Sequence, residues 1–173
     1  HGVEDETFDA VFLACHSDQA LHILSDPSKD EADILGAIRY QSNDAVLHTD
    51  TSVMPRRQRA WASWNYHLPT EENKRVTLTY HMNRLQRLNT DRQYFVTLNN
   101  ANFINPSSVI REVRYEHPLF TNTAVIAQSR KHEIDGVNRT YFCGAYWRYG
   151  FHEDGVVSAL SAVQRFEAGG AYA

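Results

Sequence analysis

The sequence predicts an α+β fold, in which a mostly antiparallel sheet with flanking helices lies between α/β segments at the two ends of the chain. Two observations carry this prediction. Continuously apolar runs at residues 8–14 and 140–143 are typical of buried strands covered on both faces, and a helical pattern follows each of them. Between these ends, short runs with strand character are separated by turn residues, which is typical of an antiparallel meander.

Two helices are expected after the first strand. The first covers about residues 17–24, where the apolar residues have helical spacing. The second begins at a capping box, because Ser28 can cap the helix while Glu31 reaches back to the amide of the capping residue. This second helix would bury Ile34, Leu35 and Ile38.

The middle of the chain is expected to form strands over residues 45–49, 60–66, 75–82, 94–98 and 110–116. The strand at 75–82 alternates cleanly, so its side chains divide between two faces. One face would carry the apolar residues Val76, Leu78, Tyr80 and Met82, and the other the polar residues Thr77, Thr79, His81 and Asn83. The polar face could line a cavity, but water is the default environment for it.

Two further helices are expected toward the C-terminal end, over about residues 121–130 and 153–168. In the last of these, Val156, Leu160 and Val163 form one apolar stripe.

Charge and composition narrow the function classes. Asp and Glu (21) outnumber Lys and Arg (17), and the formal charge of −4 argues against a general nucleic-acid binder. No apolar run approaches the ~20 residues that a membrane span needs. The nine histidines show no metal-ligand spacing, so no metal site is expected.

The two cysteines, Cys15 and Cys143, are too few for a disulfide scaffold. Each ends an apolar run, so both are expected to be buried free thiols in a reducing cytoplasm. A bridge between them stays open as an alternative if their strands are neighbours. Cytoplasmic localisation is the expectation that follows.

The segment after the last strand carries the clearest functional signal. Gly144 permits close approach of a ligand to the backbone, and a helix begins shortly after Gly150. The start of a helix presents unpaired amides and the positive end of its dipole, which can hold a phosphate or an electron-rich carbonyl edge. The same spacing also fits an ordinary strand-to-helix turn in a packed domain.

This segment resembles the C-terminal flavin-binding segment of the amine-oxidase-like FAD-dependent oxidoreductases, in which a strand ends in Phe-x-Gly before a loop and a helix start. Residues 142–144 match the strand end, and residues 150–153 match the helix start whose backbone amide faces the pyrimidine edge of the flavin. Ala145 stands where many members of the family have an acidic residue.

The resemblance extends over nearly the whole chain. Residues 8–21 are similar to the strand by which the chain leaves the FAD domain in this family. Four further blocks, residues 39–41, 54–57, 60–66 and 115–120, resemble a bacterial subgroup of predicted NAD/FAD-binding proteins.

The resemblance implies an organisation and a set of sites. Residues 1–38 would be a return segment of the FAD-type domain, residues 39–138 a substrate-type domain, and residues 139–173 the strand and helix that contact FAD. Flavin contacts are expected at Gly144, Ala145, Tyr146, Gly150, Phe151 and His152. Contacts to a small-molecule substrate are expected at Trp64, Tyr66 and His81. The resemblance names no catalytic base.

One motif of the family is absent from the sequence. Such enzymes bind the ADP half of FAD through an N-terminal Gly-x-Gly-x-x-Gly between a strand and a helix, and the chain has no such motif. The chain is therefore expected to be the C-terminal part of a flavoenzyme whose α/β pieces form an incomplete FAD-binding domain. On this interpretation its partner is the missing N-terminal half, and it does not hold FAD tightly alone.

Two other hypotheses stay open. The chain could be a non-enzymatic binding or interaction module that uses the central antiparallel sheet, or a free-standing domain that binds a small ligand without flavin. Exposed apolar faces of an incomplete α/β part would also favour self-association.

Overall fold

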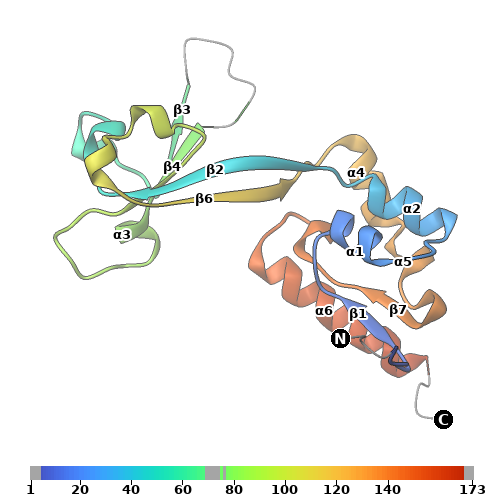
Figure 1. Cartoon of the computed structure of the whole chain (residues 1–173). Helices are drawn as coiled ribbons and strands as arrows, with labels where there is room; N and C mark the ends of the chain where they lie inside the picture. The colour runs from blue at the N-terminus through green and yellow to red at the C-terminus, as the bar shows by residue number, and fades with distance from the viewer. Residues whose placement is uncertain (1–4, 69–74, 76, 170–173) are drawn as a thin grey trace. The chain divides into compact units, whose positions relative to one another are not determined.

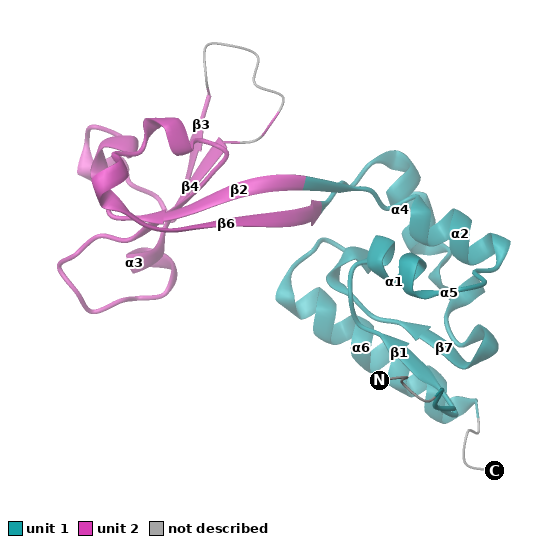
Figure 2. Ribbon diagram, viewed as in Figure 1, with its two compact units in different colours: residues 1–41, 118–173 teal, residues 42–117 magenta. Residues whose placement is uncertain are grey.

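A computed structural model describes residues 5–68, 75 and 77–169 and confirms the α+β class. It contains a five-stranded antiparallel sheet and a two-stranded parallel sheet. The chain divides into two compact units: unit 1 is His1–Gln41 with Pro118–Ala173, and unit 2 is Ser42–His117 (Figure 2). The second boundary, expected near residue 138, therefore lies at residue 117. Residues 118–138 belong to unit 1 because their helices pack against α2.

Unit 1 brings together segments from both ends of the chain. Strand β1, Val11–Leu13, pairs in parallel with β7, Thr140–Phe142, so that Leu13 lies beside Phe142 (Figure 1). The helices of this unit are α1 Ser17–Ile23, α2 Lys29–Gly36, α4 Asn122–Ser129, α5 Lys131–Ile134 and α6 His152–Ala168. Its 3₁₀ turns are η5 Val137–Arg139 and η6 Ala145–Trp147.

The predicted capping box of α2 is confirmed. The Ser28 Oγ accepts a hydrogen bond from the Glu31 amide at 3.2 Å, and the Glu31 carboxylate accepts one from the Ser28 amide at 2.7 Å. The apolar residues of this helix join the main core of unit 1, which also contains Phe142 and Trp147. The residues predicted to be buried here, Ile34, Leu35 and Ile38, are buried.

Helix α6 packs in a way that its sequence pattern does not indicate. The buried positions are Asp154, Ser158 and Ala162, which lie four residues apart on one face. That face of small residues meets β7, where Ala162 packs with Tyr141 and Cys143. The apolar stripe lies on the other side and is exposed, at 54% for Val156, 58% for Leu160 and 42% for Val163.

Both cysteines are free thiols, as predicted. Cys143 is buried next to β7, and burial raises the pKa of its thiol. Cys15, which was also expected to be buried, is only partly so.

Unit 2 is built on the sheet with strand order β3-β4-β5-β2-β6. Its strands are β2 Tyr40–His48, β3 Trp64–His67, β4 Thr77–His81, β5 Phe95–Leu98 and β6 Val109–Pro118. Shorter elements join them: α3 Met82–Leu85, η1 Thr51–Val53, η2 Gln58–Ala60, η3 Ala101–Phe103 and η4 Pro106–Ser108. Strand β3 starts at Trp64, later than the expected residue 60: a 3₁₀ turn occupies Gln58–Ala60, and residues 61–63 lie outside the strand.

The register of the sheet defines two faces. On the first face, Trp64, Tyr80, Val96 and Leu47 form one row across the strands, and Tyr66, Leu78, Leu98 and Ala45 form the next. On the second face, Asn65, Thr79, Thr97 and Val46 form a row.

The polar side of β4 belongs to the second face and is buried, so the expectation that it meets water is wrong. Thr77, Thr79 and His81 are all buried. Thr79 can be buried because neighbouring polar groups satisfy its hydroxyl, which lies 2.8 Å from that of Thr97 and 3.0 Å from Nε2 of His67. The apolar part of this core is formed by Val46, Val53, Met54, Phe95 and Ile104.

No helix in the described ranges is long and apolar enough to cross a membrane.

Candidate functional site

The segment that links β7 to α6 holds the six residues predicted to contact flavin. Gly144 follows the strand, and its amide donates to Ser158 Oγ of α6 at 3.1 Å. A Cβ at this position would collide with the ring of Tyr146, so the position requires glycine. The reason is internal packing: the neighbouring tyrosine ring occupies the space that a ligand would need above Gly144.

Tyr146 lies in the core of unit 1. Its side chain is 3% exposed and packs beside Trp147 with a ring-centroid distance of 4.9 Å. Burial raises the pKa of its hydroxyl far above the usual value. The prediction that Tyr146 touches a flavin therefore fits the structure poorly, because its ring is already surrounded by protein.

The loop before α6 is held by one carboxylate. Asp154 accepts hydrogen bonds from the amides of Tyr149 at 3.2 Å and Phe151 at 3.0 Å, and Arg148 lies 3.6 Å from it. Gly150 has φ = +87°, a left-handed conformation that favours glycine. Sequence reasoning did not single out Asp154, although an acidic residue in the first turn is a known signature of a helix start.

The start of α6 leaves two amides open to a ligand. In the described part of the chain, the backbone amides of His152 and Glu153 have no hydrogen-bond acceptor, while the next amide bonds to the Phe151 carbonyl at 3.0 Å. The side chains of Phe151 and His152 are exposed. Of the six predicted flavin contacts, Gly150, Phe151 and His152 thus lie at an accessible helix start. Gly144 and Ala145 are only partly exposed.

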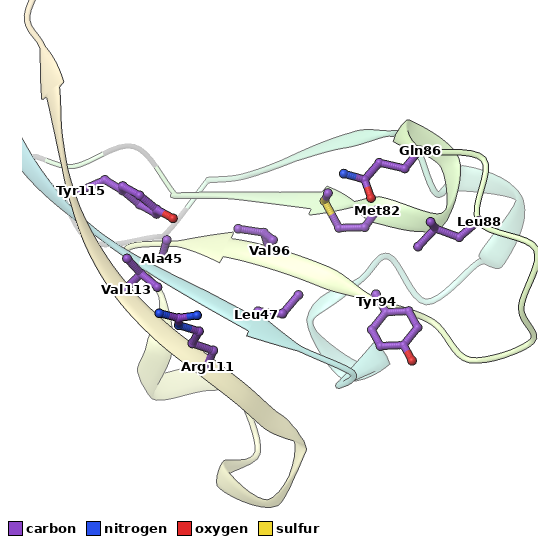
Figure 3. A pocket seen from close by; sticks show the side chains of 10 residues that line it. All are labelled: Ala45, Leu47, Met82, Gln86, Leu88, Tyr94, Val96, Arg111, Val113 and Tyr115. Carbon is purple, nitrogen blue, oxygen red and sulfur yellow. The ribbon is translucent and has the colours of Figure 1, made fainter. Parts of the chain in front are cut away.

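A second candidate site lies on the first face of the unit 2 sheet. A groove of about 560 Å³ is formed there, within the range of small-molecule pockets (Figure 3). Its lining comes from β2, β5 and β6, from Met82 of α3, and from the segment that follows α3, beginning at Gln86. The lining residues are Ala45, Leu47, Met82, Gln86, Leu88, Tyr94, Val96, Arg111, Val113 and Tyr115.

The three predicted substrate residues do not lie together. Trp64 and Tyr66 belong to the first face of the sheet, in the same cross-strand rows as Val96 and Ala45 of the groove. Both are exposed, at 55% for Trp64 and 60% for Tyr66. They extend the groove face as an aromatic surface.

His81 lies on the opposite face of the sheet and is buried. Its ring stacks on Phe95 and meets Trp61 edge-on, and its Nε2 lies 2.8 Å from Gln93 Oε1. Its Nδ1 has no hydrogen-bond partner. This placement separates His81 from the groove, so it does not form one substrate site with Trp64 and Tyr66.

Sequence reasoning missed Arg111 and the two tyrosines of the groove. The alternation over residues 110–116 contained part of the signal, since it places Arg111, Val113 and Tyr115 on one face of a strand. The alternation alone does not indicate that this face of the strand lines a groove. Across the described residues, no three His, Cys, Asp or Glu side chains come together as a metal site.

No protein-family model matches this chain, and no curated protein is significantly similar to it.

Proposed function

We propose that this chain is the C-terminal part of an FAD-dependent oxidoreductase of the amine-oxidase type, and that it contributes flavin-edge contacts and a substrate cavity. FAD would accept a hydride from a C–H bond at the carbon of a C–N or C–C bond of a small-molecule substrate, the neighbouring atom would lose a proton, and that bond would become a double bond. Oxygen or another acceptor would then reoxidise the reduced flavin. The chain's own residues would bind and orient the two partners. Because no family model or curated relative matches, the proposal rests on the sequence resemblance and on the physical state of unit 1.

The observation that carries the proposal is the uncovered apolar surface of unit 1. Parallel sheets are normally covered on both faces, and two strands alone are marginally stable. Here β1 and β7 form a two-stranded parallel sheet, and Val11 and Phe12 of β1 are exposed. The apolar stripe of α6, defined by Val156, Leu160 and Val163, is exposed as well. Such a surface is expected where further strands and helices of an α/β domain are missing.

The proposed flavin contacts are narrowed by the geometry. The open amides of His152 and Glu153, at the positive end of the 17-residue helix α6, suit the electron-rich pyrimidine edge of a flavin. Asp154 is occupied with the loop amides, so its charge is partly satisfied before any ligand arrives. Gly144, Ala145 and Tyr146 would act by supporting this helix start rather than by touching the cofactor.

The most direct test reads the DNA immediately upstream of the codon for His1. The proposal predicts an open reading frame that encodes a strand, a Gly-x-Gly-x-x-Gly and a helix. A start codon at this position, with no such segment, would contradict it. The proposal also predicts that the purified 173-residue chain carries no stoichiometric flavin in its absorbance spectrum.

The same proposal includes a cytoplasmic location and self-association of the isolated chain. Two free cysteines suit a reducing compartment. The exposed stripe of α6 offers an apolar surface to a second copy.

A second candidate is a non-enzymatic binding module that uses the central sheet. The groove of unit 2 favours it, because the groove is formed by this unit alone and needs no flavin. Ligand saturation of the chain without flavin, together with a start codon at His1, would favour this function over the flavoenzyme.

A further inference from the structure

The groove of unit 2 combines an apolar floor with a single charged side chain. Leu47 from β2, Val96 from β5 and Val113 from β6 belong to the floor. Arg111 is the one charged residue among the described residues that line the groove. It lies two residues before Val113 on the same strand, so both side chains point to the same face (Figure 3).

The Arg111 guanidinium has no partner among the residues that the structure describes, neither a hydrogen bond nor an ion pair. Arg114, on the opposite face of the same strand, shows the contrast: its Nε lies 3.0 Å from a carboxylate oxygen of Asp44. An arginine side chain stays charged at every physiological pH and presents five donors in a planar fork. Arg111 is exposed, so water solvates its guanidinium, and its charge is available to a ligand anion at the edge of the apolar surface.

Neutral polar groups complete the groove. Gln86, Tyr94 and Tyr115 supply an amide and two hydroxyl groups in the same lining, and none of them adds a negative charge that would neutralise Arg111. The electrostatic character of the groove is therefore that of one positive charge beside an apolar floor.

We propose that this groove binds a small hydrophobic carboxylate, with its apolar body on the sheet and its carboxylate on Arg111. The planar fork of a guanidinium matches a carboxylate in a bidentate pair. Packing the apolar body of the ligand on the floor removes apolar surface from water, which adds favourable binding free energy. The assignment of this ligand as the substrate rests on the proposed oxidoreductase function, whereas its binding depends only on unit 2.

The test is a calorimetric titration of the flavin-free chain with decanoate, 1-decanol and decylamine, which share an apolar body and differ in charge. Decanoate is expected to bind about tenfold more tightly than 1-decanol, because a hydrogen bond to a charged partner adds to the same apolar contact. Decylamine is expected to bind most weakly. Equal affinities for decanoate and 1-decanol, or no binding of decanoate, would overturn the proposal.

Two matched arginine variants test whether the preference for decanoate depends on Arg111. Arg111→Gln is expected to weaken the binding of decanoate about tenfold and to leave the affinity for 1-decanol unchanged. Arg114→Gln removes the same charge from the other face of β6 and is expected to change decanoate affinity less than about twofold, because exposed charges act weakly at a distance. Equal losses in the two variants would show a general charge effect and overturn the assignment.

Two controls separate this proposal from others. Leu160→Gln alters the exposed stripe of α6 in unit 1 and is expected to leave decanoate binding unchanged, whereas a loss would place the ligand there and refute the groove. Absence of flavin from the longer gene product would refute the proposed oxidoreductase and leave the decanoate preference as predicted. The two failures are therefore distinguishable.

Discussion

Replacing Thr97 by Val removes the central hydroxyl of a buried hydrogen-bond chain in unit 2. Its Oγ1 lies 2.8 Å from Nε2 of His48 and 2.8 Å from the Thr79 hydroxyl, and all three side chains are fully buried. Valine has nearly the same shape, so the change creates no large cavity, but it leaves the Nε2 of His48 without a partner and removes one of the two partners of the Thr79 hydroxyl. A buried polar group left without a partner costs about 1–3 kcal/mol. Because Thr79 keeps its contact with His67, we expect a total loss of about 2–3 kcal/mol.

The assay is urea unfolding followed by tryptophan fluorescence, since Trp61 and Trp64 lie in unit 2. A loss of this size lowers the urea midpoint by about 1–2 M at ordinary slopes. Thr90→Val is the matched control, because Thr90 lies in an exposed loop and should cost less than about 0.5 kcal/mol. A Thr97→Val protein within about 0.5 kcal/mol of the wild type, or equal costs in both variants, would refute the reasoning.

Three further predictions concern pH, packing and association. Burial lowers the pKa of His48 in the folded protein, so the unfolded chain binds more protons than the folded one at mildly acidic pH. The free energy of unfolding should therefore fall as the pH drops below about 6.5. In urea titrations from neutral to mildly acidic pH, His48→Gln should make this pH dependence weaker. Gly144→Ala should cost about 1–3 kcal/mol because its Cβ meets the Tyr146 ring, whereas Gly36→Ala, with ordinary contacts, should not destabilise the fold; equal melting temperatures would contradict this. Leu160→Gln should reduce self-association in light scattering, and a clean monomer of the wild type would argue against the exposed stripe as a contact surface.

Local features of the fold were predictable because their causes lie within a few residues. The Ser28 and Glu31 capping box and the start of α2 follow from side chains three positions apart. The continuous apolar runs at the two ends do form strands, as predicted. The expected burial holds for β7, where Tyr141 and Phe142 are buried, but is wrong for β1, where Val11 and Phe12 are exposed.

Features that depend on distant partners were not predictable. The polar face of β4 is buried because β5 and β3 bring Thr97 and His67 to Thr79, and a single strand carries no information about those neighbours. The face of α6 that packs could not be predicted either, because it depends on the shape of the strand that it meets. Its small residues fit closely on β7, while Leu160 faces outward.

Of the two candidate sites, one could be predicted from local sequence and the other could not. The accessible helix start at Phe151 and His152 follows from local sequence, because Gly150 and an acidic first turn mark it. The groove could not be predicted from local sequence, because its floor combines strands that are far apart in the chain. Only the arrangement of these strands places Arg111 beside an apolar floor.

The chain is proposed to belong to a flavoenzyme. The most direct measurement is the absorbance spectrum of the protein made from the whole reading frame that contains the chain, compared with the spectrum of the 173-residue chain. The account predicts stoichiometric FAD in the longer protein and none in the shorter one. A longer protein without bound flavin, or a 173-residue chain that carries it stoichiometrically, would contradict the account.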